Sequence, residues 1–303
     1  MGIWSVLAAT FNDWYDDRAQ RMGAALAYYT VFALAPGVVL IVAVAGLGFG
    51  TETAQQQFVE QIGYLLGTEG ARAIEAMIIS ARRQAVGTTA AILAAGTLLF
   101  GLWGVFGELQ DALNTIWGVA PKPGRSFLQM VRDRFLSFAM VTGIGFLLLV
   151  SLAVSAWLAA AGKFFSYLLP APETVLKAID MSVSFAVITV LFALTFKLLP
   201  DVKVAWRDVW LGAAVTSLLF VAGKSLIGLY LGKSSIGSVY GAAGSLVVIL
   251  VWVYYSSQIV IFGAEFTKVW ARRRGGGAVV DPTAVPLTKE AKHEQGIGRR
   301  DVV

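Results

Sequence analysis

Polar side chains inside an otherwise apolar stretch are the first candidates for chemistry in this sequence. In VYYSSQIVIFGAEFTKVWARRR, residues 253–274, Gln258 and Glu265 follow Tyr254 by four and eleven residues, a spacing that places all three on one face of a helix. A carboxylate at membrane depth costs about 2.5–3.5 kcal/mol on insertion scales, so it normally faces other helices and has a partner. Such a face can bind a polar group or carry a proton.

A second stretch, GLWGVFGELQDALNTIWG at 101–118, has the same design. Glu108 and Asp111 follow Gly101 and Gly104 on one helical face. Small residues let two helices approach closely. A similar small-residue surface is formed near the start of the last apolar stretch by Gly237, Gly241 and Ser245. We therefore expect these two helices to pack together, with Glu108, Asp111 and Glu265 near one end.

Three carboxylates at one depth require protonation or basic partners. The basic residues expected at that level are Arg21, Arg132, Arg134 and Lys268, and Arg21 is favoured because it directly precedes the first apolar stretch. Two interpretations are open at this point. The cluster is either a set of ion pairs that fixes helix register or a polar, protonatable pathway.

Two further residues interrupt apolar stretches. Lys224 either extends its stem to the membrane interface or, if buried, attracts anionic headgroups. Pro36 removes one helical hydrogen bond and is expected to bend the first membrane-spanning helix.

The elements that must position these residues are long apolar helices. The chain has 303 residues, of which 57% are hydrophobic and 14% charged, a composition typical of membrane proteins. About 20 apolar residues cross a bilayer as a helix, and in lipid every backbone polar group must be paired within the segment. The sequence predicts an all-α, polytopic six-helix bundle. Its expected spans are 24–50, 88–107, 135–161, 181–200, 208–231 and 239–270.

Lysines and arginines near the span ends gather on one side when the N-terminus is placed inside. This distribution predicts that both termini are cytoplasmic. Residues 1–23 form the expected N-terminal segment, and 24–270 form the transmembrane domain. Within that domain, residues 51–87 are expected to make short amphipathic external helices. Residues 271–303 are rich in Gly, Pro and mixed charge, and they are expected to be a disordered cytoplasmic tail.

Three segments together resemble the YihY/BrkB family of bacterial inner-membrane proteins over roughly residues 15–271. They are ALAYYTVFALAP at 25–36, GELQDALNTIWG at 107–118 and SVYGAAGSLVVILVWVYYSSQIVIFGAEFTKVWA at 238–271. The resemblance implies an inner-membrane location and six helices. The positions that match the family pattern are Tyr28, Tyr29, Pro36, Glu108, Asn114, Trp117, Tyr240, Gly241, Gly244, Gln258, Gly263 and Glu265. With Asn114 added on this basis, the candidate polar cluster consists of Arg21, Glu108, Asp111, Asn114, Gln258 and Glu265.

The family carries old labels as a ribonuclease and as a virulence factor, and one subfamily is linked to export of envelope lipid or lipopolysaccharide. The residues disfavour the ribonuclease, because metal-dependent cleavage needs clustered histidines and carboxylates and the single histidine, His293, lies in the tail segment. We therefore expect no enzymatic activity, no cofactor, no metal and no nucleic-acid partner. Membrane lipids are the expected partners. Translocation of an envelope lipid or related amphiphile is the preferred function, and the alternative is a non-transporting assembly factor that acts with an envelope protein. The sequence leaves the oligomeric state open.

Overall fold

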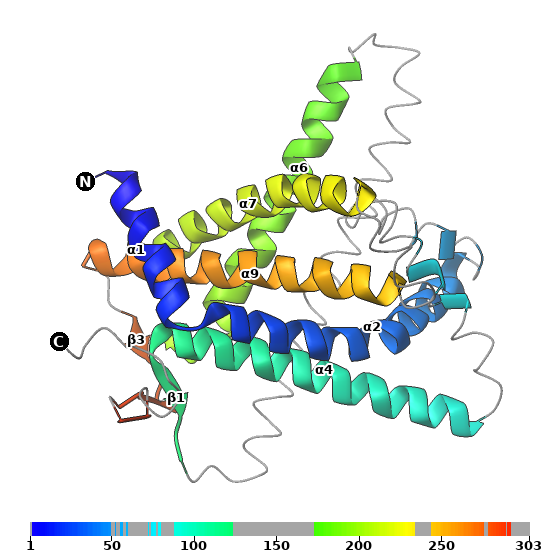
Figure 1. The fold of residues 1–303 in the computed structure, drawn as a ribbon, viewed down its shortest axis with the longest axis horizontal. Helices are drawn as coiled ribbons and strands as arrows, with labels where there is room; N and C mark the ends of the chain where they lie inside the picture. The colour runs from blue at the N-terminus through cyan, green and yellow to red at the C-terminus, as the bar shows by residue number, and fades with distance from the viewer. Residues whose placement is uncertain are drawn as a thin grey trace. The chain divides into compact units, whose positions relative to one another are not determined.

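The fold is mostly helical, and Figure 1 traces its elements along the chain. The computed structural model describes residues 2–49, 88–123, 173–233, 244–275 and 278–288, with single positions between 52 and 79 and at 290 and 291. Its elements are α1 (Ile3–Asp16), α2 (Ala19–Phe49), α4 (Thr88–Trp117), β1 (Val119–Pro121), α6 (Glu173–Leu198), β2 (Val202–Lys203), α7 (Trp206–Lys233), α9 (Gly244–Arg273), β3 (Val279–Val280) and β4 (Ala284–Pro286).

The long helices coincide with five of the expected spans. Within the described residues, the segments long and apolar enough to cross a bilayer are Met181–Leu198, Trp206–Ile227 and Leu246–Arg273. Helices α2 and α4 have 31 and 30 residues, and α2 continues through Pro36. The expected span at 135–161 lies outside the described residues. The six-span bundle therefore stays a prediction.

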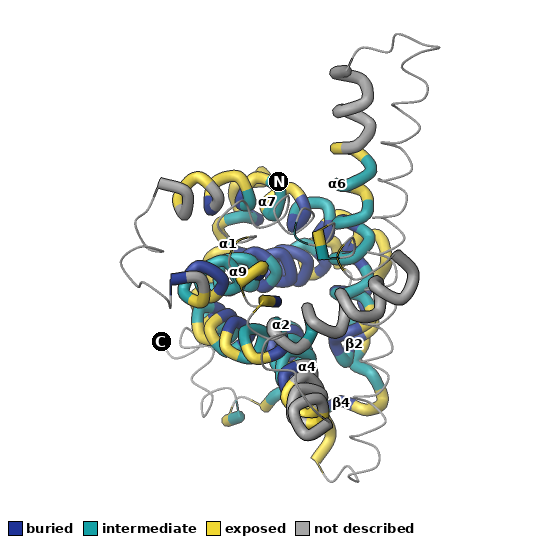
Figure 2. Tube along the Cα trace, turned by 90° about the vertical axis from the view of Figure 1, so that its right-hand side faces the viewer, coloured by how far each residue is buried: buried dark blue, intermediate teal, exposed yellow. Residues whose placement is uncertain are grey.

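Large apolar residues are exposed along these helices, and Figure 2 colours the exposed positions of α7 yellow. Leu218, Leu226 and Leu229 of α7 are 63%, 64% and 60% exposed, and Ile92 and Phe100 of α4 are each 65% exposed. In water, apolar surface of this extent favours association. Facing lipid, the same side chains meet acyl chains, which is what helices of this length and composition require.

The described chain forms two compact units. Unit 1 contains residues 1–10, 113–218 and 263–292, and unit 2 contains residues 11–112, 219–262 and 293–303. In unit 1, α1 packs on α9 through Val6, Phe266 and Val269. In unit 2, Ile227 of α7 packs with Val248 of α9. Each unit thus has a hydrophobic core of its own.

The glycines of α4 pack against a different helix from the one expected. A Cβ at Gly101 would lie 2.7 Å from the backbone of Ala33, and one at Gly104 would lie 2.2 Å from the Tyr29 ring, so α4 contacts α2 closely in unit 2. The sequence pairs these glycines with Gly237, Gly241 and Ser245 of the last span. Spacing identifies a surface that allows close approach, but it does not say which neighbour uses that surface. Gly237 and Gly241 lie outside the described residues, and Ser245 lies in the first turn of α9.

Part of the segment expected to be an external amphipathic pair is described. Ile74 and Ile78 are helical and buried, and they form a cluster with Ile249 of α9. Val31 and Leu34 of α2 pack against this cluster. At these positions the apolar face expected from the helical spacing is covered by membrane-length helices.

The segment expected to be disordered from 271 onward contains ordered structure. Helix α9 continues to Arg273, and the strands β3 and β4 follow it. Strand β1 pairs antiparallel with β4, and β2 pairs antiparallel with β3. The C-terminal segment therefore joins the loop after α4 to the loop between α6 and α7 within unit 1.

The prolines of the first ladder fit a strand because of their register. Backbone hydrogen bonds run from Lys122 to Thr283 and from Leu287 to Gly118, on either side of the β1–β4 pairing. Hydrogen-bonded and non-hydrogen-bonded pairs alternate in an antiparallel ladder. The proline that ends each strand falls at a non-hydrogen-bonded position, where its missing N–H is not needed. Composition alone predicts disorder here because it does not include this register.

Candidate functional site

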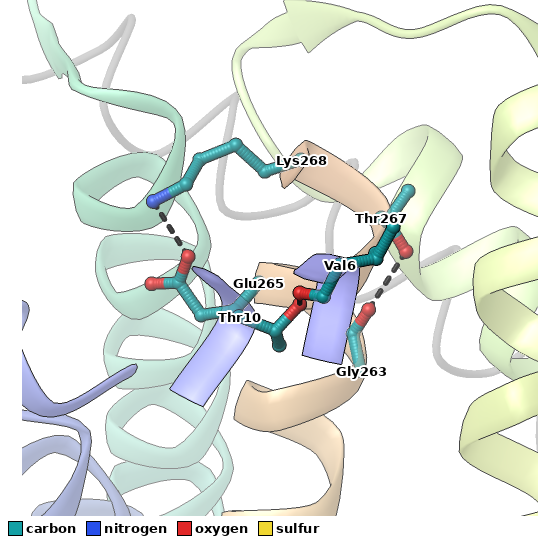
Figure 3. Close-up of polar contacts among 6 residues, drawn as sticks. All are labelled: Val6, Thr10, Gly263, Glu265, Thr267 and Lys268. Carbon is teal, nitrogen blue, oxygen red and sulfur yellow. Dashed lines mark hydrogen bonds and ion pairs between the residues drawn. The ribbon is translucent and has the colours of Figure 1, made fainter. Parts of the chain in front are cut away.

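An ion pair is buried near the end of α9. Lys268 Nζ lies 2.5 Å from Glu265 Oε2, and the two side chains are 3% and 0% exposed. Residues three apart on a helix lie on the same face, so the lysine can fold back onto the carboxylate, as Figure 3 shows. The sequence favours Arg21 as the basic partner of this cluster, with Lys268 as another candidate. The structure pairs Glu265 with Lys268.

The helices around this pair are packed by small and hydroxyl residues. A Cβ at Gly212 of α7 would lie 1.8 Å from Thr267 Oγ1, and a Cβ at Gly263 of α9 would lie 1.9 Å from Thr216 Oγ1. The two threonines donate to the carbonyls of Gly263 and Gly212, each on its own helix. Each helix thus offers a glycine to the threonine of the other, and the hydroxyls are satisfied without leaving their helix. Glu265 lies between Gly263 and Thr267 along α9, and it is fully buried.

Asn114 has a different environment from the one expected. Its Nδ2 donates to Asp201 Oδ2 at 2.9 Å, and the Asp201 backbone N–H donates to Asn114 Oδ1 at 2.8 Å. Asp201 also accepts a backbone hydrogen bond from Asp281, just after β3. The asparagine therefore joins the end of α4 to the loop after α6 and, through Asp201, to the C-terminal segment. Nothing in the local sequence pattern marks Asp201 as its partner, because the two residues are 87 positions apart.

Gln258 lies at the contact between α9 and α2 in unit 2. Its Nε2 donates to the carbonyl of Ala19 at 3.2 Å. A Cβ at Gly23 would lie 2.0 Å from that nitrogen, so any larger residue there would displace the amide from this position. The Oε1 atom is buried, and it has no hydrogen-bond partner among the described residues. Gly23 carries no signal in the sequence pattern, since its role depends on a side chain 235 residues away in the chain.

Glu108 follows the apolar span 88–107 and has charged groups of both signs near it. Burial raises the pKa of Glu108 above its ordinary value, the nearby Asp111 carboxylate raises it further, and the Arg21 guanidinium lowers it. Asp111 and Arg21 therefore both act electrostatically on Glu108 within unit 2. The predicted association of Arg21 with these carboxylates stays a prediction.

The predicted cluster is divided between the two units. Asn114 and Glu265 belong to unit 1, and the remaining members, Arg21, Glu108, Asp111 and Gln258, belong to unit 2. The convergence of Glu265 with Glu108 stays a prediction. Lys224 is partly buried on α7 in unit 2, and its contact with headgroups is likewise a prediction.

Comparison with known proteins gives a family for this arrangement. Residues 10–288 match the family described as Virulence factor BrkB. The chain belongs to this family. The match extends through β3 and β4, beyond the end of the resemblance at 271 expected from the sequence, so the strand-forming segment is part of the BrkB family region.

Curated relatives of the BrkB-family chain are named as membrane proteins. A UPF0761 membrane protein of Pseudomonas aeruginosa strain LESB58 is 29% identical over 279 residues, which are 85% of this chain and 62% of the relative. The UPF0761 membrane protein YihY of Escherichia coli O1:K1 is 33% identical over 202 residues, 65% of this chain and 62% of the relative. The chain thus spans less than two thirds of the length of these relatives. No solved structure matches it.

These relatives and the long apolar helices make the chain an integral membrane protein of the YihY/BrkB family. The names of the relatives state no catalytic activity. The polar side chains of Glu265, Gln258 and Asn114 described above lie on the long helices α9 and α4.

Proposed function

We propose that this BrkB-family protein moves an envelope lipid, or a related amphiphile, between the leaflets of the bacterial inner membrane. A lipid crosses a bilayer slowly because its polar headgroup must enter hydrocarbon, where unpaired polar groups cost several kcal/mol. A protein that lowers this barrier needs polar side chains at membrane depth. It must also leave them able to exchange partners.

Gln258 is the observation that carries the proposal. It lies within the apolar segment Leu246–Arg273, its amide nitrogen bonds the carbonyl of Ala19, and its buried Oε1 has no protein partner among the described residues. Leaving a buried acceptor unsatisfied costs about 1–3 kcal/mol. A hydroxyl or ammonium group of a passing headgroup would satisfy this oxygen.

The class of substrate rests on two further points. The large exposed side chains of α4 and α7 are apolar, so the helices offer acyl chains a compatible surface. The family resemblance adds a subfamily linked to export of envelope lipid or lipopolysaccharide. A headgroup that follows polar residues while its tails stay in the bilayer is consistent with both points.

The test is a bleaching assay with purified full-length protein in proteoliposomes that contain a fluorescent phospholipid. Dithionite added outside bleaches the outer leaflet, and the later loss of signal reports crossing from the inner leaflet. We expect faster crossing than in empty liposomes and slower crossing for Gln258→Met, which keeps the side-chain length but removes the amide. Ser257→Ala is the matched control, because that hydroxyl already bonds the Val253 carbonyl on its own helix.

One result would count against translocation of the lipid, and another against the role of Gln258. Crossing no faster than in empty liposomes would favour the alternative, an assembly factor that needs an envelope protein partner. Equal crossing for wild type, Gln258→Met and Ser257→Ala would remove Gln258 from the path. The melting temperature of each variant in detergent is measured alongside, so that a misfolded variant is not scored as an inactive one.

A further inference from the structure

Helix α1 leaves an apolar face uncovered. Trp4 is 81% exposed, and Ala8, Phe11 and Tyr15, which are also exposed, follow it at intervals of four, seven and eleven residues. That spacing defines one stripe along a helix. Val6 lies on the opposite side and is buried. The exposed side is therefore not the one that attaches α1 to the protein.

The attachment of α1 to α9 positions two arginines beside the part of this stripe that lies in unit 1. Val6 packs against Phe266 and Val269, and Arg273 donates from Nη1 to Ser5 Oγ and from Nη2 to the Ser5 carbonyl, both at 2.7 Å. These contacts all lie in unit 1. The orientation of α1 is thus fixed by packing and by a two-pronged hydrogen bond.

The charges of these arginines remain available to a ligand. Among the described residues the hydrogen-bond partner of Arg273 is Ser5, a neutral group, and no carboxylate pairs with it. A guanidinium has five N–H donors, of which this contact uses two. Arg274 stacks on Trp270 with its Cζ 4.7 Å from the ring centroid, an arrangement that leaves its N–H groups accessible. Both arginines are exposed.

We propose that the part of this stripe that lies in unit 1, Trp4 and Ala8, together with Arg273 and Arg274 of the same unit, is a docking surface for the anionic phospholipids of the bilayer. Trp4 and Ala8 enter the interfacial layer, and the two guanidinium groups bind headgroup phosphates. Tryptophan concentrates at membrane interfaces, and guanidinium groups recognise phosphate through paired hydrogen bonds.

The connectivity of the chain favours a bilayer over a protein as the occupant. Helix α1 ends at Asp16, and α2, the first long apolar helix, begins at Ala19, so α1 stays within a short reach of the point where the chain enters lipid. Its anchor, Arg273, is the last residue of the apolar helix α9. An aromatic side chain beside uncompensated arginines matches an anionic interface in both polarity and charge.

The absence of cysteine from the chain makes a clean test possible. An environment-sensitive dye is attached to Ala8→Cys in the full-length protein, which keeps Trp4 and the arginines intact. The protein is placed in nanodiscs with a small fraction of brominated phosphatidylglycerol or, separately, brominated phosphatidylcholine. Quenching by each lipid and by aqueous iodide is then compared. The same dye on Val279→Cys, an exposed apolar position of β3, is the reference.

We expect the dye at position 8 to be quenched more by brominated phosphatidylglycerol than by phosphatidylcholine and less by iodide than the dye at position 279. Arg273→Gln should reduce the preference for the anionic lipid about fivefold, the effect of one basic residue near an anionic surface. Arg273→Lys retains the charge and should retain most of the preference. Lys203→Gln, the same loss of charge at an exposed position of β2, should leave it unchanged.

Three outcomes would overturn the proposal. Strong iodide quenching at position 8, equal to that at 279, would place the stripe in water. Weak quenching by every agent would mean that a second copy of the protein covers α1. Equal quenching by the two brominated lipids would show interfacial contact without recognition of anionic headgroups.

Discussion

Glu265 and Lys268 show how a single residue pair determines the character of the site. Both side chains are buried, and each offsets the charge of the other. Replacing both members of such a pair with apolar residues is often tolerated, whereas removing one leaves an uncompensated buried charge. The contact with Lys268 therefore favours the interpretation of Glu265 as part of a structural ion pair.

Lys268→Met is expected to destabilise the protein by about 3–5 kcal/mol, because Glu265 would lose its cation in a buried position. The double variant Glu265→Met with Lys268→Met should be less destabilised than the sum of the two single variants. Melting temperatures in detergent measure both effects. Additive losses would mean that the two side chains do not stabilise each other.

Asn114→Ala is expected to cost about 1–3 kcal/mol, since Asp201 would lose two hydrogen bonds at once. Asn114→Asp should cost more, because it places a second carboxylate beside Asp201. Asn12→Ala, a similar truncation at an exposed position of α1, is the control. If Asn114→Ala has the same melting temperature as Asn12→Ala, the two hydrogen bonds between Asn114 and Asp201 contribute nothing to stability.

At the scale of elements, the described helix contacts depend on glycines placed opposite larger side chains. Gly101 and Gly104 bring α4 onto α2, Gly23 accommodates Gln258, and the reciprocal glycine and threonine pairs join α7 to α9. In lipid there is no hydrophobic force between helices, so close packing is the main source of association. The absence of a Cβ at these glycines therefore stabilises the protein, because it lets the helices pack closely.

Gly212→Ala should lower the melting temperature, because its Cβ would lie within 1.8 Å of Thr267 Oγ1. Combining Gly212→Ala with Thr267→Gly should restore part of the loss, because the second change makes room on the other helix. Gly96→Ala has open space around it and should be neutral or slightly stabilising, as expected for alanine in a helix. Equal effects at 96 and 212 would contradict the close crossing.

At the scale of the molecule, the C-terminal segment connects parts of the chain that are far apart in sequence. Strand β3 pairs with the loop that follows α6, and β4 pairs with the loop that follows α4. The family match includes both strands. Short strands of two or three residues are weak alone. These strands therefore stabilise the fold only when α4, α6 and α9 hold the paired segments next to each other.

The register of the first ladder predicts a specific cross-link. Ala120 lies opposite Val285, so Ala120→Cys with Val285→Cys should form a disulfide under mild oxidation, in a chain that has no other cysteine. Ala120→Cys with Pro286→Cys is shifted by one residue, and its side chains lie on opposite faces. Labelling of free thiols after denaturation shows which of the two double variants has formed a disulfide. Cross-linking of the shifted pair alone would show that the strands pair in another register.

The sequence by itself determined the membrane character, the helical secondary structure and the positions of five long apolar helices, because these depend on composition and on helical period along continuous stretches of chain. It also selected Gln258 and Glu265, since polar residues within such stretches are conspicuous. The tertiary structure decided which groups meet. Asp201 pairs with Asn114, Gly23 lies against Gln258, and two proline-ended strands form a ladder. Such pairings depend on how helices cross and on strand register, and neither is encoded in the local period of the sequence.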